Sequence, residues 1–182
     1  MPLELNKEFE KYTEIIYSTV ETEFRIKTDD FLDYILTAIE NLKFICLKYD
    51  LCYVDELENL NNLENEEILN FCADLKNNTK KEFLDNIFNN YENINKVELN
   101  KNFNDFNEVY EATILTKITL WHFGPNELYI NKLKFICLKY ELYDANELEI
   151  INIRNLDKAA EFISELQENI VNDLKEKILN KQ

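Results

Sequence analysis

The stretch LKFICLKYDL, Leu42 to Leu51, occurs a second time as LKFICLKYEL, Leu133 to Leu142. The two copies differ at one position, where Asp50 is matched by Glu141. Within LKFICLKY, the first eight residues of each copy, only the two lysines are polar, so this segment is apolar on nearly every side of a helix. A helix of this kind is typical of the middle of a bundle and not of its edge. We therefore predict that the decapeptide forms a central core helix, whose packing permits few substitutions.

The repeat extends well beyond the decapeptide. ELNKEFEKYTEI (residues 4–15) aligns with ELNKNFNDFNEV (residues 98–109) at an offset of 94, whereas later apolar positions pair at an offset of 91. A three-residue deletion in the second copy reconciles the two offsets. We predict a tandem duplication of a helical unit of about 90 residues, with about four to five helices in each unit and both units packed as one helical bundle. The units are assigned to residues 1–95 and 96–182.

The composition predicts an all-α fold. The 182 residues include one Gly and two Pro, and these are the residues on which turns in sheets and loop-rich folds depend. Apolar residues also recur three or four positions apart, the spacing of one helical face. In the first unit the positions that follow this spacing are Leu5, Phe9, Tyr12, Ile16 and Val20.

Local signals predict where several helices begin. Thr28, before two aspartates, is expected to cap the helix that carries the decapeptide. A short helix is expected near residues 55–61, and a further one over residues 65–76. Thr79-Lys80-Lys81-Glu82 has the form of a capping box, so we expect a separate helix to begin there and to run through Tyr91.

Catalytic motifs are absent from the sequence. The single histidine, His122, does not suffice for a usual metal site, and a single Gly allows no glycine-rich phosphate loop or nucleophile elbow. The four cysteines lie in apolar surroundings, where thiols stay protonated. We therefore expect no catalytic residues, no metal, no cofactor and no enzymatic activity.

The sequence predicts a cytoplasmic protein. The first residues, MPLELNKEFEKY, contain no apolar run of the kind found in signal peptides. No stretch approaches the ~18 apolar residues that span a bilayer. The cysteines show neither CxxC spacing nor the density of a disulfide framework, which favours a reducing compartment.

The net charge of −16 restricts the kinds of molecule that we expect the protein to bind. It argues against direct binding to nucleic acid phosphates and against docking on anionic lipid. Residues 1–95 contain 21 acidic and 9 basic side chains, whereas residues 96–182 contain 15 and 11, so the first half carries most of the excess.

One stretch of the first unit is acidic without interruption. No basic residue occurs between Lys48 and Lys76, although surface helices usually mix the two signs. The equivalent stretch of the second unit includes Arg154 and Lys158. An unmixed acidic face attracts a cationic partner and speeds encounter, although solubility and helix capping also explain single carboxylates. As partner-binding residues we predict Asp55, Glu56, Glu58, Glu64, Glu66 and Glu67, the set called the acidic segment below.

The second distinctive stretch is LWHFGP, Leu120 to Pro125, at a predicted connection between helices. It contains the only Trp, the only His and the only Gly, and Pro125 is expected to start the next helix. Trp121 and Phe123 either fill a seam between the units or, with His122, act as an aromatic anchor for a partner, because Trp and Tyr dominate interface hot spots.

These properties suggest a binding protein. A small, acidic, helical and motif-free chain resembles bacterial immunity proteins in general character, which implies neutralisation of a basic toxin or nuclease by occlusion. One alternative is a phage-type DNA mimic that inhibits a nuclease or a restriction or CRISPR complex. Regular carboxylate spacing along an elongated face would favour mimicry. A further alternative is a helical adaptor or structural module with an exposed apolar furrow.

Overall fold

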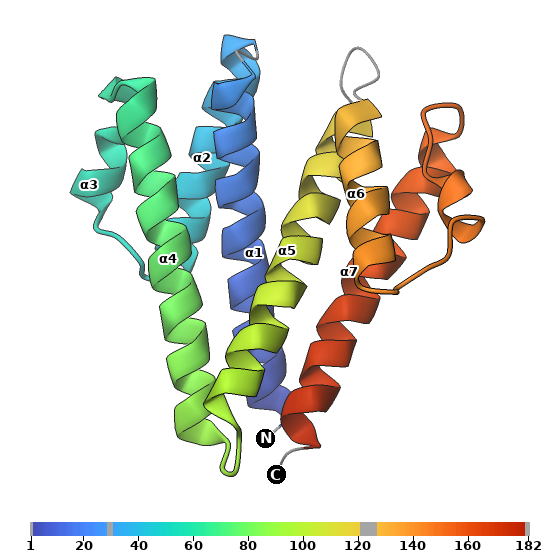
Figure 1. The fold of residues 1–182 in the computed structure, drawn as a ribbon. Helices are drawn as coiled ribbons and strands as arrows, with labels where there is room; N and C mark the ends of the chain where they lie inside the picture. The colour runs from blue at the N-terminus through green and yellow to red at the C-terminus, as the bar shows by residue number, and fades with distance from the viewer. Residues whose placement is uncertain (1, 29–30, 121–126, 181–182) are drawn as a thin grey trace. The chain divides into compact units, whose positions relative to one another are not determined.

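A computed structural model describes residues 2–28, 31–120 and 127–180. These residues form helices and no strand, so the all-α prediction is confirmed (Figure 1). None of the helices so described combines the length and apolar character that a membrane span requires. In chain order the helices are α1 (Pro2–Lys27), α2 (Leu32–Lys48), α3 (Val54–Glu58), η1 (Leu60–Asn62), α4 (Asn65–Asn90), α5 (Lys96–Leu120), α6 (Glu127–Lys139), η2 (Glu147–Ile150) and α7 (Leu156–Leu179).

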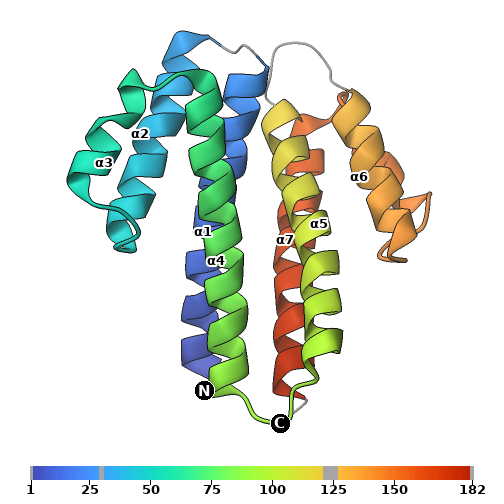
Figure 2. The same cartoon turned by 60° about the vertical axis from the view of Figure 1, so that its left-hand side comes forward.

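The chain divides into two compact units, Met1–Asn90 and Tyr91–Gln182. Each unit is built around its first helix, which packs along both neighbours (Figures 1 and 2). In the first unit α1 contacts α2 and α4, and in the second α5 contacts α6 and α7. The short helices α3, η1 and η2 lie between the second helix and the last helix of their unit in sequence.

The first helix of each unit is central because apolar side chains surround much of it. The five positions predicted from helical spacing, Leu5 to Val20, are all buried, and so are Ile15 and Phe24. Phe9 packs edge-on against Phe83 of α4, with ring centroids 5.0 Å apart. A helix buried on more than one side needs apolar residues outside a single stripe, and α1 has them.

The repeated decapeptide does not form the central helix, so that prediction is wrong. α2 and α6 each pack on the first helix of their unit, and Leu42 and Cys46 are fully buried there. On the other side of the same turns, Phe44 is 62% exposed and its counterpart Phe135 is 66% exposed. The apolar character on all sides therefore includes a surface that the described residues do not cover.

Two predicted helix starts are also wrong. Thr28 follows α1, and its hydroxyl donates to the Phe24 carbonyl oxygen at 2.8 Å, so it closes α1 and does not open α2. At the start of α2 the N-cap position is occupied by Phe31, which makes no side-chain capping bond.

The second wrong start is Thr79, which lies inside the continuous helix α4. Its hydroxyl is buried and donates to the Leu75 carbonyl oxygen at 2.7 Å, one turn earlier. A threonine that bonds back in this way does not need to cap a new helix. The first unit consequently has four described α-helices, within the four to five expected, whereas the second has three described α-helices, fewer than expected.

The end of the decapeptide is a helix cap that both copies form in the same way. Asp50 and Glu141 adopt left-handed backbone conformations, with φ of 53° and 55°. The next residue donates its N–H back across the turn, from Leu51 to Cys46 and from Leu142 to Cys137, at 2.9 Å in each case. This is a Schellman motif, in which glycine is usual at the left-handed position. The matched acidic residue in LKYDL and LKYEL thus marks where each helix ends.

A polar cluster ties the first two helices of each unit together beside this cap. Glu14 accepts hydrogen bonds from Lys48 Nζ at 2.9 Å and from the Tyr49 hydroxyl at 2.8 Å. In the second unit Glu108 accepts from Lys139 Nζ and from the Tyr140 hydroxyl. The hydrogen bond from the Tyr140 hydroxyl is the largest cause of the lowered pKa of Glu108; burial opposes it, and Lys139 lowers the pKa further.

Leu42→Ala should destabilise the protein much more than Phe44→Ala, although the two residues are two positions apart. Removing a fully buried leucine costs about 2–5 kcal/mol, whereas an exposed side chain away from specific contacts usually changes the free energy of unfolding by about 0.5 kcal/mol or less. Urea unfolding followed by circular dichroism measures both. Equal losses would mean that Phe44 is covered as well.

Glu108→Gln should lower stability at pH 7 and have little effect in acid. Because the folded-state pKa is lowered, the contribution of the carboxylate is present above the ordinary pKa of about 4.3 and is lost as the pH falls through the folded-state value. The cluster is partly exposed and screened by water, so we expect a loss of about 0.5–1 kcal/mol at pH 7. Unfolding at pH 7 and pH 3 tests this, with the exposed Glu161→Gln as the control; a pH-independent loss would contradict it.

Candidate functional site

The acidic segment lies on the short helical region between α2 and α4. Three of its carboxylates are on α3, and the other three are at Glu64 and in the first turn of α4. All six side chains are exposed. Both views show α3 near the amino-terminal end of α4, so the carboxylates gather in one region of the first unit (Figures 1 and 2).

Local sequence explains why this region folds into two helix starts. The Glu56 carboxylate accepts from the Tyr53 N–H at 3.0 Å, and the Glu67 carboxylate accepts from the Glu64 N–H at 2.9 Å. Carboxylates are favourable at helix amino termini, where N–H groups lack partners. Leu57 is buried and anchors the region to the core of the unit. Glu56 and Glu67 therefore have a structural role as well as a charge.

The charge of the acidic segment is not neutralised by the part of the protein that the structure describes. Among the described residues, none of its six carboxylates forms an ion pair. The lysines that flank it are bound elsewhere, since Lys48 pairs with Glu14 at 2.9 Å and Lys76 with Glu23 at 3.0 Å. An uncompensated negative surface attracts cationic groups over distances of about a Debye length, ~8–10 Å at physiological salt.

Exposed apolar side chains directly precede these carboxylates. Tyr53 is 80% exposed and Val54 is 53% exposed, both at the start of α3. In protein–protein interfaces, aromatic residues are enriched at the centre and polar groups surround them at the rim. Tyr53 and Val54 were not predicted from the sequence, although they stand out as an apolar pair directly before Asp55 in a segment rich in polar residues.

The second unit builds the same region with mixed charge. Ahead of η2 the Glu147 carboxylate accepts from the Asp144 N–H at 2.8 Å, as the Glu56 carboxylate accepts from the corresponding Tyr53 N–H in the first unit. Before α7, however, the amide of Asn155 caps the helix by accepting from the Lys158 N–H at 3.3 Å. A helix start of this kind therefore forms without the carboxylate pair of Glu64 and Glu67. Capping alone does not require the excess of acid in the first unit.

The aromatic connection predicted to bind a partner lies outside the described residues. Trp121, His122 and Phe123 fall between the end of α5 at Leu120 and the start of α6 at Glu127. Pro125, predicted to start a helix, falls in the same interval. Their role stays a prediction.

The cysteines have the environment of core residues. Burial raises the pKa of Cys46 and of Cys72 to about 12, and that of Cys137 to about 11. At neutral pH these groups are thiols, which are poor nucleophiles. In the part of the chain that the structure describes, no group of three or more His, Cys, Asp or Glu residues is placed to hold a metal ion.

Comparisons with known proteins do not identify the class of this chain. No protein-family model matches it, and no significant match was found among curated proteins or solved structures.

Cys46, Cys72 and Cys137 should resist thiol reagents in the folded protein, because they are buried and their pKa values are raised. Ellman's reagent at pH 8 should label the partly exposed Cys52 first and the other three only after urea is added. Cys52→Ser should abolish the fast phase. Rapid labelling of Cys46 or Cys72 without denaturant, located by mass spectrometry, would contradict the packing.

Proposed function

We propose that this protein is a non-enzymatic acidic binding protein that captures a basic protein partner through the acidic segment. In biological terms, the proposal is an immunity-type protein that neutralises a basic toxin or nuclease by covering it. The observation that carries the proposal is a set of six exposed carboxylates, in one region, without ion-pair partners among the described residues. Lysine and arginine side chains of the bound protein would form ion pairs with these carboxylates.

The contrast between the two units supports this proposal. Both build corresponding short helical regions, but only the first does so with acid alone. A feature that the fold does not need is a better candidate for function than one that the fold requires. The exposed Tyr53 and Val54 add an apolar contact beside the charges, as a specific interface needs.

The proposed mechanism is steering followed by occlusion. The negative field would raise the rate of encounter with a cationic surface, and this effect weakens with salt. Tyr53 and neighbouring apolar groups would then be desolvated, which slows dissociation. No covalent chemistry is involved, and the buried thiols fit that view. We place the protein in the cytoplasm, where such thiols stay reduced.

The same residues bear on two other functions. A phage-type DNA mimic would present carboxylates at regular spacing along an elongated face, whereas these lie within residues 55–67 around one short helix. This gathering favours a dedicated protein contact. A helical adaptor is supported by the exposed Phe44 and Phe135, which offer apolar surface on α2 and α6.

We also infer that the two units arose by tandem duplication. Corresponding residues make corresponding hydrogen bonds, which supports a common origin of the units. Thr22 donates to the Ser18 and Ala38 carbonyls, and Thr116 donates to the Ala112 and Tyr129 carbonyls. Further pairs are Glu14 with Glu108, Asp50 with Glu141, and Glu56 with Glu147.

Charge reversal at Glu58, Glu64 and Glu66 to Lys should abolish capture of the partner. These three are chosen because their carboxylates cap no backbone N–H, unlike those of Glu56 and Glu67. Immobilised protein is incubated with extract of the source organism at low and high salt, and retained basic proteins are identified by mass spectrometry. The association rate of the purified partner should fall about tenfold or more in the variant, and its salt dependence should flatten.

The matched control is Glu161, Glu165 and Glu168 to Lys on α7 of the second unit. It changes the net charge by the same amount on another exposed surface. The proposal expects this control to retain the partner and nearly its full association rate. Equal loss in both variants would leave only a general effect of net charge and would overturn the assignment to the acidic segment, as would full retention in the first variant.

A further inference from the structure

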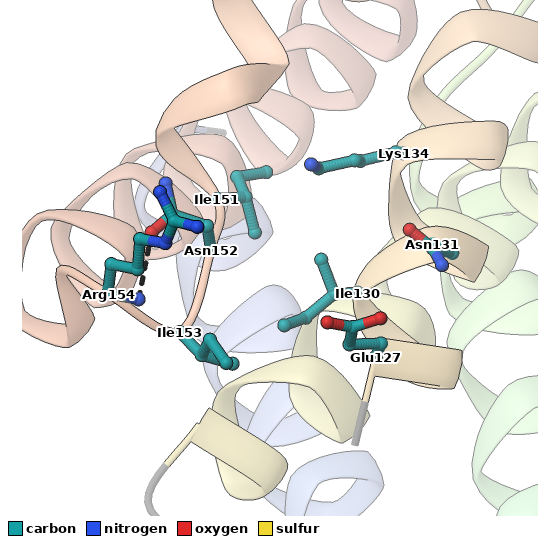
Figure 3. Close-up of a pocket in the computed structure, with 8 residues that line it drawn as sticks. All are labelled: Glu127, Ile130, Asn131, Lys134, Ile151, Asn152, Ile153 and Arg154. Carbon is teal, nitrogen blue, oxygen red and sulfur yellow. Dashed lines mark hydrogen bonds between the residues drawn. The ribbon is translucent and has the colours of Figure 1, made fainter. Parts of the chain in front are cut away.

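The second unit contains a cavity of about 400 Å³ between α6 and the loop that follows η2 (Figure 3). Its volume lies within the range of small-molecule sites, roughly 300–1,000 Å³. In Figure 3 Lys134 extends from α6 toward the loop residue Ile151, and Arg154 lies on the loop side. The residues that line it are Glu127, Ile130, Asn131, Lys134, Ile151, Asn152, Ile153 and Arg154.

Two cationic side chains line this cavity without a partner. Among the described residues, neither Lys134 Nζ nor the Arg154 guanidinium makes a hydrogen bond or an ion pair. In a chain of net charge −16, cations are scarce and the described lysines often pair, as Lys43, Lys48 and Lys76 do. Two unpaired cations around one concave site are therefore a feature to be explained.

In the first unit a carboxylate occupies the place that corresponds to this cavity. The offset of 91 pairs Lys134 with Lys43 and Asn152 with Asn61. There the carboxylate of Glu40 accepts from Lys43 Nζ at 2.9 Å and from Asn61 Nδ2 at 3.2 Å. One carboxylate thus joins the second helix to the short helical region.

The second unit keeps the donors and lacks the carboxylate. Asn131 stands at the position of Glu40, and Arg154 stands at the position of Leu63, so an anion is lost and a cation is gained. The Asn152 side chain is held by the loop, since its Nδ2 donates to the Glu149 carbonyl at 2.7 Å and its Oδ1 accepts from the Arg154 N–H at 2.9 Å. The loop that presents Arg154 is thereby fixed.

We propose that this cavity binds a ligand that carries one carboxylate next to an apolar group. The carboxylate would take the place that Glu40 fills in the first unit and would accept from Lys134 and Arg154; an arginine fork suits the two oxygens of a carboxylate. Ile130, Ile151 and Ile153 supply the apolar wall. The site lies in the second unit and does not depend on the acidic segment.

Glu127, the third charged residue of the lining, favours an anion with a single negative charge. Glu127, in the first turn of α6, also lines the cavity and leaves the lining with a net charge of +1. A phosphate dianion would meet repulsion from Glu127, whereas a single carboxylate balances the charge of the lining. The same Glu127 can accept a hydrogen bond from an N–H group of the ligand. A peptide carboxyl terminus and a free N-acyl amino acid share this chemistry.

The probe is N-acetyl-leucine, added to the ¹⁵N-labelled full-length protein and followed by ¹H–¹⁵N NMR. We expect saturable shift changes at Ile130, Asn131 and residues 151–154. N-acetyl-leucinamide lacks the negative charge, and we expect it to bind at least about tenfold more weakly than N-acetyl-leucine. We expect the same of inorganic phosphate. The affinities are obtained from the concentration dependence of the shifts. A peptide ending in a free leucine carboxylate, compared with its amide, separates the two sources of ligand.

Two substitutions test the geometry by copying the first unit. Asn131→Glu places a carboxylate where Glu40 stands, and Arg154→Leu removes the added cation. Both positions are exposed, so the fold should be kept, which a thermal melt checks. Each should weaken binding of N-acetyl-leucine about tenfold or more, whereas Lys132→Gln, which removes a charge from α6 outside the cavity, should leave it unchanged.

Several results would overturn the proposal. They are the absence of saturable shifts with N-acetyl-leucine, equal affinity for its amide, tighter binding of phosphate, and unchanged affinity in both Asn131→Glu and Arg154→Leu. Shifts spread over exposed lysines of both units, and equally reduced by Lys132→Gln, would indicate nonspecific charge binding and would overturn it too.

Discussion

The burial of one long helix between two others is the constraint on which each unit depends. α1 and α5 occupy this position, and apolar or small hydroxyl side chains cover them on several sides. The hydroxyls of Thr22 and Thr116 show how polar groups are accommodated there, since each donates to a carbonyl of its own helix and to one of the neighbouring helix. Because α1 and α5 lie at the centre of their units, the other helices pack on them with one buried face each.

The all-helical class followed from composition, because a chain with one glycine has few ways to make sheets and tight turns. The place of the decapeptide in the fold did not follow. The sequence shows that Phe44 and Leu47 are apolar residues on a helix, but it does not show whether another helix covers them; both are exposed. The helix start predicted at Thr79 was wrong for a related reason. A threonine that caps a helix and a threonine whose hydroxyl bonds to a carbonyl one turn earlier in the same helix cannot be distinguished in the sequence.

The candidate site was predicted in part. Uninterrupted acid between Lys48 and Lys76 is visible in the sequence, and the exposed carboxylates follow from it. The cavity beside Lys134 was not predicted, because its lining joins two segments about 20 residues apart and its significance lies in a comparison with Glu40. Only coordinates show that one carboxylate bridges two elements in the first unit and that the second unit lacks it.

The left-handed residue at the end of α2 has a consequence for how the molecule can change. Asp50 fixes the direction in which the chain leaves the helix, so it sets the platform from which α3 projects. Because an acidic residue adopts the left-handed conformation here, glycine at this position would remove the steric cost of the positive φ, whereas valine or isoleucine would raise it. Exposed residues of α3 can therefore be exchanged one at a time, whereas the left-handed conformation at position 50 restricts that position to few side chains.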